Sequence, residues 1–154
     1  MTDIQINDLA EPVFDEFQHS GLEFGESLDT DFNPEAILAE ASDALAMTDF
    51  GPDDFRERLD LVCDEWDNDK GRTGIGRFGL RNRLVGYAKN RLLIQDMLSS
   101  HPEIHEQKIE QPIIVIGIPR TGTRHMLNLL AADSRLRAMP LWESYEPVPT
   151  PGEG

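Results

Sequence analysis

The apolar residues of the chain first become periodic after Asn33-Pro34-Glu35, which follows an acidic stretch with scattered Phe and Leu. Asparagine suits the cap of a helix, proline suits its first position, and glutamate suits the positive end of the helix dipole. The apolar residues that follow recur at helical spacing: Ile37, Leu38, Ala41 and Leu45. The pattern therefore predicts a helix that begins at this point.

Two further helices are predicted before residue 101. A second start signal, Gly51-Pro52-Asp53-Asp54, precedes a helix that ends before Gly71, with an apolar stripe of Phe55, Leu59, Val62, Cys63 and Trp66. A third helix runs from about Gly76 to Ser99. His101-Pro102 closes it, because the residue before a proline avoids helical geometry.

The pattern changes at Pro112, where a short run of β-branched residues begins. Ile113-Ile114-Val115-Ile116 is continuous rather than alternating, which is typical of a strand buried on both faces of a parallel sheet. A glycine-bounded loop follows, and helical periodicity then returns at Met126, Leu127, Leu129 and Leu130. This order of strand, loop and helix predicts a P-loop-type α/β domain, a three-layer structure around a parallel sheet, preceded by a helical N-terminal region.

These elements suggest three parts of the chain. We expect a poorly ordered acidic arm over residues 1–33, a helical region over 34–108, and the start of a P-loop domain over 109–154. One strand cannot make a sheet, and the last residues are turn-like. We therefore expect the chain to be a fragment or a truncated protein that is inactive alone, with open strand edges that favour self-association or a complementing C-terminal chain.

Charge and composition exclude several classes of protein. The chain has 154 residues and a net charge of −15, and the first fifty residues hold no Lys or Arg, so a nucleic-acid-binding surface is not expected. The basic residues between Arg72 and Arg91 are expected to pair with the acidic helices. No apolar run has the length of a membrane span, and the acidic N-terminus is unlike a signal peptide, so we expect a cytoplasmic protein. Cys63 is the single cysteine and is expected to be a buried apolar residue.

The loop Gly117-Ile118-Pro119-Arg120-Thr121-Gly122-Thr123 has the chemistry of an anion cradle. Glycines allow the backbone to approach a ligand closely, and the loop leads into a helix N-terminus. The threonine hydroxyls add donors, and Arg120 adds a charged planar fork that suits phosphate. In the nucleoside-triphosphate loop G-x-x-x-x-G-K-[ST], a lysine and a hydroxyl would stand where this chain has Thr123 and Arg124, so magnesium-dependent ATP or GTP chemistry is disfavoured.

The segment Pro112–Thr123 resembles the 5′-phosphosulfate loop of the sulfotransferase family, closest to the branch with P-R-[ST]-G-T-T that includes bacterial and tyrosylprotein sulfotransferases. Weaker similarities extend the resemblance over roughly residues 34–152: the segments 49–56, 129–133, 141–143 and 147–149. Members transfer a sulfuryl group from 3′-phosphoadenosine 5′-phosphosulfate (PAPS) to a hydroxyl or amine. The resemblance thus implies PAPS as co-substrate and a small-molecule or peptide acceptor.

The resemblance also implies roles for individual residues. Arg120 matches the basic residue that stabilises charge on the leaving 5′-phosphate, and Thr121, Gly122 and Thr123 match positions that bind this phosphate. Arg124 stands where a threonine is usual, so its guanidinium either meets the phosphate or fills the cradle. Later in the family sequence, beyond the length of this chain, come the arginine and serine that hold the 3′-phosphate.

A general base is expected to take the acceptor proton. Tyrosylprotein members use a glutamate soon after the loop helix, and Glu143 is the residue that aligns with it; otherwise it is a surface or capping carboxylate beside Trp142. Glu146 and His125 are the other candidates near the loop. The four histidines and one cysteine show no metal-ligand spacing, so we expect no metal site.

Two other functions stay open at this point. One is a different P-loop enzyme that acts on a small anion or a nucleotide, such as a kinase, which the missing lysine argues against. The other is a helical interaction module in which the P-loop is a relic.

Overall fold

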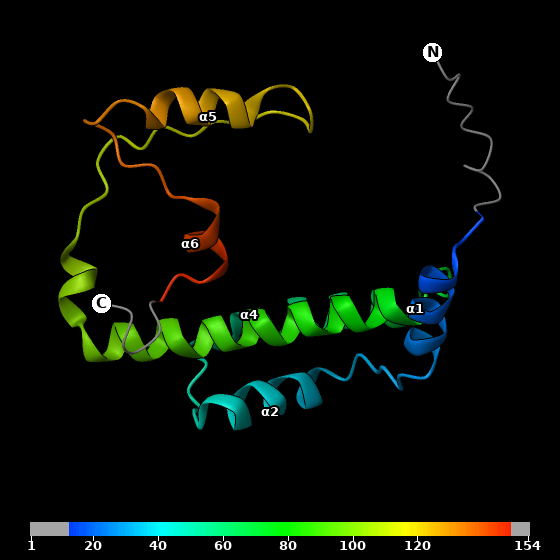
Figure 1. Ribbon diagram of the computed structural model, residues 1–154. Helices are drawn as coiled ribbons and strands as arrows, with labels where there is room; N and C mark the ends of the chain where they lie inside the picture. Colours follow the sequence, from blue (N-terminus) through cyan, green and yellow to red (C-terminus); the bar gives the residue numbers. More distant parts are fainter. Residues whose placement is uncertain (1–12, 149–154) are drawn as a thin grey trace, which may run out of the picture. The chain divides into compact units, whose positions relative to one another are not determined.

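The computed structural model describes residues 13–148, and the regular elements of this part of the chain are helices (Figure 1). The chain divides into two compact units, one ending at Lys89 and one beginning at Asn90. The elements in order are α1 (Glu16–Glu26), α2 (Pro34–Leu45), the 3₁₀ turn η1 (Asp53–Phe55), α3 (Arg56–Asn68), α4 (Gly74–Ser100), the 3₁₀ turn η2 (Pro102–Glu106), α5 (Thr123–Ala131) and α6 (Leu141–Tyr145). The division between the units falls inside α4.

The three helices predicted before residue 101 are confirmed. At the start of α2 the Asn33 side chain accepts a hydrogen bond of 3.1 Å from the Ala36 amide, and Pro34 occupies the first turn as expected. α3 follows η1 directly and ends at Asn68, before Gly71. α4 begins two residues earlier than predicted, with the Thr73 hydroxyl 3.3 Å from the Gly76 amide as its cap.

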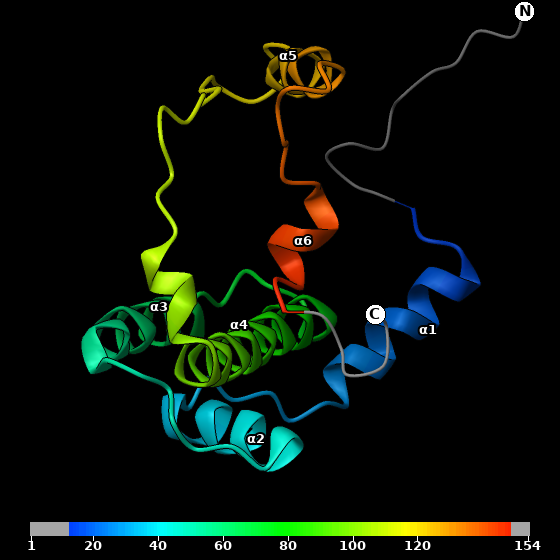
Figure 2. The same ribbon diagram turned by 90° about the vertical axis from the view of Figure 1, so that its left-hand side faces the viewer.

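The first unit has a hydrophobic core between α2, α3 and the first part of α4, which lie together in Figure 2. Aligned apolar stripes explain this arrangement, because each helix buries one face against the others. The buried side chains come from all three helices and the segments between them: Phe32, Ile37, Leu38, Ala41, Phe50, Cys63, Leu84, Val85 and Ala88. Cys63 is 2% exposed and unpaired, and burial raises the pKa of its thiol, which confirms the expected apolar role.

The backbones of α1 and of the first turn of α4 approach each other closely at two glycines, Gly25 and Gly74. A Cβ atom built on Gly25 would lie 2.3 Å from the Ile75 amide nitrogen, and one on Gly74 would lie 2.2 Å from the Gly25 carbonyl oxygen. The Gly74 amide also donates a hydrogen bond of 2.9 Å to the Glu26 carboxylate. Glu26 therefore satisfies one of the free amides at the start of α4.

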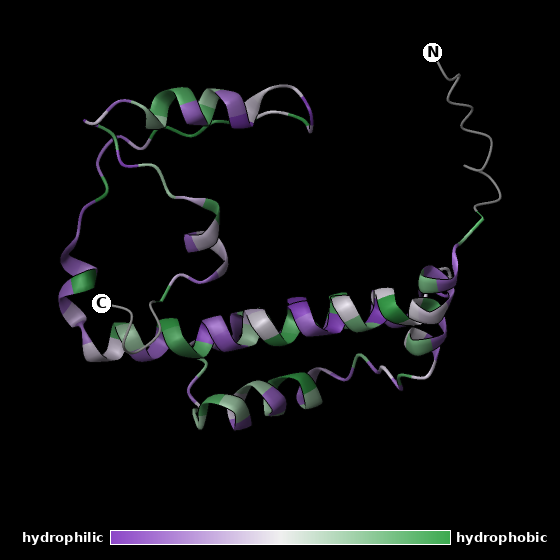
Figure 3. Ribbon diagram, in the orientation of Figure 1, coloured by the Kyte–Doolittle hydropathy of each residue, from purple (hydrophilic) through white to green (hydrophobic). Residues whose placement is uncertain are grey.

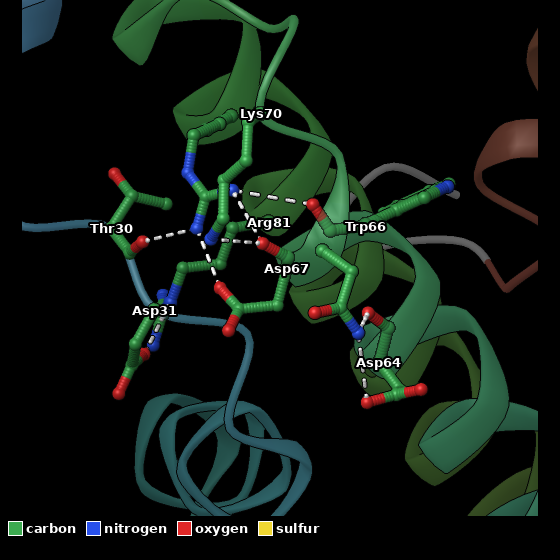
Figure 4. A network of polar contacts seen from close by, with 9 residues as sticks. Thr30, Asp31, Asp64, Trp66, Asp67, Lys70 and Arg81 are labelled. Carbon is green, nitrogen blue, oxygen red and sulfur yellow. Dashed lines mark hydrogen bonds and ion pairs between the residues drawn. The ribbon is translucent and has the colours of Figure 1, made fainter.

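Arg77 connects three segments of the first unit. Its guanidinium donates to the carbonyl oxygens of Thr30 and Trp66, each at 3.2 Å, and to the Asp67 carboxylate at 2.6 Å. It also lies over the Phe32 ring, 4.9 Å from the centroid. Thr30, Trp66 and Asp67 lie together in Figure 4. The expected pairing of basic α4 residues with acidic neighbours is confirmed here and at Arg81, which pairs with Glu40 at 2.5 Å.

The predicted P-loop α/β domain with a parallel sheet is wrong, because the structure contains no β-strand within residues 13–148. The run predicted as a strand, residues 112–116, is not assigned to one, and Ile114 is 73% and Ile116 87% exposed. β-branched residues favour an extended backbone, but a strand also needs a neighbour to complete its hydrogen-bond ladder. No described segment supplies that neighbour.

The predicted division into parts at residues 33 and 108 stays a prediction. Residues 16–26 of the predicted arm form α1, capped by reciprocal hydrogen bonds between Asp15 and Gln18, whereas residues 1–12 lie outside the described residues. The turn-like end expected at residues 149–154 also lies outside them. Among the helices of the described region, none is long and apolar enough to cross a bilayer.

The close approach of α1 to α4 predicts opposite effects for two glycines of α1. Gly25→Ala should destabilise the first unit by roughly 1–3 kcal/mol, because the added methyl group overlaps backbone atoms of Ile75. Gly21→Ala should stabilise it by roughly 0.5–1 kcal/mol, because nothing lies within 4 Å of the added atom and alanine favours the helix. Urea unfolding followed by circular dichroism measures the free energy of unfolding of both variants. Equal changes in the two variants would contradict the close packing of α1 on α4.

The contacts of Arg77 predict that its removal lowers the free energy of unfolding of the first unit substantially. Arg77→Ala should cost roughly 1.5–3 kcal/mol, because three acceptors lose a charged donor that is only 20% exposed. The matched control is Arg58→Ala, which removes the same charge from a side chain that is 69% exposed and pairs with Asp54. The control should change the free energy of unfolding by less than about 0.5 kcal/mol. Thermal unfolding compares the two variants.

Candidate functional site

The predicted anion loop lies between residues 112–116, the run predicted as a strand, and α5. Gly122 caps α5 in the left-handed region, with φ of 91°, and contributes no side chain to the helix start. No other side chain of the described structure caps this helix. The first amides of α5 therefore keep free N–H groups at the positive end of its dipole.

Arg120 has a backbone conformation that is uncommon for a residue with a side chain. Its φ is 70°, and Gly122 two residues later is also left-handed. Such a conformation costs on the order of 1–3 kcal/mol and is often found at functional sites. The Thr121 hydroxyl donates to the Ile118 carbonyl at 2.7 Å, and the Thr121 amide lies 3.4 Å from the same oxygen. The loop is thus a tight turn that brings its amides toward one side.

Gly117 allows the loop to fold back on the start of α5. A Cβ atom at this position would lie 2.6 Å from the Thr123 methyl carbon and 2.9 Å from the Thr121 hydroxyl oxygen. A larger residue would push both threonines away. Gly117 is therefore required because a side chain there would collide with the two threonines. Gly122 is required because its backbone is left-handed.

A hollow of about 450 Å³ opens at this turn, which we call the loop hollow. Its lining contains four of the five predicted cofactor-binding residues: Arg120, Gly122, Thr123 and Arg124, together with Pro119. Thr121 is not part of the lining, since its hydroxyl is turned to the Ile118 carbonyl. Arg124, which sequence analysis left as either a phosphate ligand or an obstruction, lies at the rim of an open hollow.

The arginines of the second unit differ in what they contact. Arg135 binds Asp133 through two nitrogens, at 2.6 and 3.0 Å, and this pairing lowers the pKa of the Asp133 carboxyl. Arg137 pairs with Glu143 at 2.8 Å. Within residues 13–148, no ion pair or side-chain hydrogen bond engages Arg120 or Arg124. Two unpaired cations therefore line the loop hollow.

Glu143, the predicted general base, lies on α6 and does not line the loop hollow. Its carboxylate is held by Arg137, and its side chain is 25% exposed. Glu146 follows the end of α6, and His125 lies in the first turn of α5; both are exposed. The structure thus brings together four of the five predicted phosphate ligands, without Thr121, and pairs the predicted base with Arg137.

A second, larger hollow of about 930 Å³ adjoins the loop hollow, because Thr123 and Arg124 line both. Its other walls come from residue 115, from α5, from the segment before α6 and from α6 itself, and they are mostly apolar: Val115, Leu127, Ala131, Ala138, Met139, Pro140 and Leu141, with Asn128 and Ser144 as polar members. Sequence analysis did not identify Asn128 or Ser144. No spacing pattern marks these two residues, because Ser144 on α6 meets Asn128 on α5 at one hollow only through the way the chain folds after α5.

Metal-ligating side chains do not cluster in the described part of the chain, where no three His, Cys, Asp or Glu residues come together. The groups that gather at the loop are cations and backbone amides. This donor set fits an anionic group such as a phosphate or phosphosulfate.

A comparison with solved protein structures finds one chain that is similar to this one. The chain is similar to sulfotransferase STF1 from Mycobacterium tuberculosis H37Rv (type1 form), with a TM-score of 0.70 and 34% sequence identity. The match covers 76% of this chain and 33% of that one, so the chain corresponds to about a third of the length of the sulfotransferase. No family model matches the chain, and no curated protein matches it.

The similarity supports a sulfotransferase-like fold for this chain, as the loop resemblance implied. It does not distinguish the branch with P-R-[ST]-G-T-T from other sulfotransferases.

The contacts of Gly117 predict that the loop will not tolerate a methyl group there. Gly117→Ala should displace Thr121 and Thr123, and so shift the amide resonances of residues 117–126 in a ¹H–¹⁵N spectrum. Gly79→Ala is the control, because nothing lies within 4 Å of its added atom in the middle of α4. If the amide resonances in the Gly117→Ala variant shifted only at the substituted residue, as expected for the control, the contacts of Gly117 with Thr121 and Thr123 would be contradicted.

Proposed function

We propose that this chain carries the phosphosulfate-binding part of a sulfotransferase. The observation that carries the proposal is the pair of arginines, Arg120 and Arg124, that have no ion-pair partner among the described residues and line a hollow at the uncapped start of α5. The similarity to a solved sulfotransferase supports it. The proposed reaction moves a sulfuryl group from 3′-phosphoadenosine 5′-phosphosulfate to a hydroxyl or amine of a small molecule or peptide.

The residues of the loop suit the charge that such a reaction develops. When the bond between sulfur and the bridging oxygen breaks, the negative charge grows on the 5′-phosphate of the departing 3′,5′-bisphosphate. Arg120 supplies a fixed cation at the loop, and the free amides of α5 add their dipoles. The left-handed backbone at residues 120 and 122 sets the turn that leads into the uncapped start of α5, so the amide groups there are preorganised.

Glu143 is the residue that we propose to accept the proton of the acceptor. Its carboxylate is oriented by Arg137 at 2.8 Å. For Glu143 to serve as the base, this ion pair must open or the acceptor must reach the exposed side of the carboxylate.

The complete transfer reaction is proposed for a protein in which further polypeptide accompanies this chain. The match spans 33% of the sulfotransferase STF1, so most of that enzyme has no counterpart in the aligned region. We propose a complementing chain or segment as the source of the remaining site, and a cytoplasmic location, which agrees with the single unpaired Cys63.

Ligand binding tests the role of the loop without requiring turnover. Adenosine 3′,5′-bisphosphate, titrated in the presence of EDTA, should shift the amide resonances of residues 117–126. Arg120→Ala should weaken this binding about tenfold or more, because a charge-assisted contact contributes roughly 1.5–3 kcal/mol. Arg135→Ala is the matched control, since it removes the same charge from an arginine already committed to Asp133; its affinity should stay within about threefold of wild type.

Other outcomes would support the competing functions. Binding of ATP that depends on magnesium would favour a kinase or another nucleotide enzyme and contradict the proposal. Intact helices with no response to either nucleotide would favour a helical interaction module. If Arg120→Ala and wild type bound adenosine 3′,5′-bisphosphate with equal affinity, Arg120 would not be part of the binding site.

A further inference from the structure

α6 carries Glu143, the proposed base, but this helix is too short to be stable by itself. It has five residues, whereas an isolated helix of fewer than about 12–15 residues is marginal in water. None of its residues is buried, and Figure 3 shows α6 mostly in pale and hydrophilic colours. Apolar packing therefore does not fix the position of α6 in this chain, and polar contacts carry more of that role.

Contacts among residues 137–146 shape α6 locally. The Ser144 hydroxyl and the Glu146 amide donate hydrogen bonds to carbonyl oxygens inside α6, at 2.6 and 2.9 Å. Arg137 donates to the Glu143 carboxylate at 2.8 Å. Because these residues are close together in the sequence, their contacts define the conformation of the segment, but they do not determine where the segment lies in the second unit.

A hydrogen bond from a distant residue ties α6 to α4. The Asn90 side-chain amide donates to the Tyr145 carbonyl at 2.5 Å, across 55 positions of the sequence. Tyr145 is the last residue of α6, so its carbonyl is one of the groups at a helix end that have no partner inside the helix. Asn90 therefore supplies a donor to the C-terminal end of α6. Both residues belong to the second unit.

Asn90 lies on a part of α4 that can serve as a fixed support. It stands inside the long helix Gly74–Ser100, away from either end, and it is half-buried. Leu92, two residues later, is 1% exposed, so packing holds this part of α4 in place. A donor on a packed helix thus meets an acceptor on a helix that has no buried residue of its own.

We propose that Asn90 is a positioning residue for proton transfer: it holds the C-terminal end of α6 on α4 and thereby fixes where the Glu143 carboxylate lies relative to the anion loop. This inference rests on the proposed role of Glu143 as the base. Arg137 orients the carboxylate within its segment, whereas Asn90 places the segment. α6 also supplies Leu141 and Ser144 to the wall of the larger hollow, so the same hydrogen bond sets the shape of that wall.

A spin label on α4 measures the position of α6. A nitroxide attached at Asp96→Cys, an exposed position of α4, should broaden the amide resonances of residues 141–146; Cys63 is 2% exposed and does not compete for the label. Asn90→Leu should reduce this broadening about twofold or more, because a five-residue helix without that anchor moves away. Asn90→Gln keeps an amide donor and should restore most of the broadening.

Asn82→Leu is the matched control, because it makes the same change at an exposed position of the same helix. It should leave the broadening of residues 141–146 as it is with Asn90 and Asn82 intact. Titration with adenosine 3′,5′-bisphosphate on the same samples tests the loop separately. Asn90→Leu should bind this nucleotide within about twofold of wild type, because Asn90 does not line the loop hollow. Absence of binding by wild type would contradict the proposed function and would leave the contact of Asn90 with α6 intact.

Turnover separates positioning of the base from a purely structural role. In a complex with the accompanying polypeptide that completes the sulfotransferase, Asn90→Leu should lower kcat about tenfold or more, because the base is displaced from the acceptor. The KM for PAPS should stay within about twofold of wild type, because the loop is unchanged. Asn90→Gln should recover most of the lost kcat.

Two results would overturn the proposal. Equal broadening of residues 141–146 in Asn90→Leu and wild type would show that other contacts hold α6. An unchanged kcat in Asn90→Leu, measured together with a displaced α6, would show that transfer does not depend on where Asn90 places Glu143.

Discussion

An α-helix satisfies its backbone hydrogen bonds within itself, whereas an extended segment must find them on another segment. The two units of this chain show the consequence. In residues 13–89 of the first unit the apolar stripes of the helices meet in one core, and nine hydrophobic side chains are buried there. In the described part of the second unit Leu92 is the one buried hydrophobic side chain. Ile114 and Ile116 before the loop are exposed, and α5 and α6 contribute no buried residue.

The first unit depends on a few contacts that join helices distant in sequence. Glycines at positions 25 and 74 let the backbones of α1 and α4 approach closely, and Glu26 occupies an amide that would otherwise be free. Arg77 then ties α4 to the end of α3 and to the segment before α2. The Trp66 carbonyl lies in the last turn of α3 and the Thr30 carbonyl lies between α1 and α2, so neither has a partner inside a helix and Arg77 supplies one.

In the second unit the anion loop is built mainly by its own backbone. The left-handed residues 120 and 122 and the contact of Gly117 with two threonines define the turn within seven residues. This explains how the loop hollow forms in a unit that has little core. The cations at its rim keep their charge available, since Arg135 and Arg137 rather than Arg120 and Arg124 are used in ion pairs among the described residues.

The sequence alone determined the features that depend on neighbouring residues. The cap at Asn33, the apolar stripes of α2, α3 and α4, and the glycine loop leading into α5 all follow from short-range rules, and the structure confirms each of these elements. The loop pattern also implied a sulfotransferase, and the similarity to a solved sulfotransferase agrees with it at the level of fold. Only the tertiary structure decided the rest. β-branched composition predicted a buried strand at residues 112–116, but pairing needs a second segment, and none is present among residues 13–148. Likewise, the resemblance to tyrosylprotein sulfotransferases implied Glu143 as the base, whereas its ion pair with Arg137 depends on how the chain folds after α5.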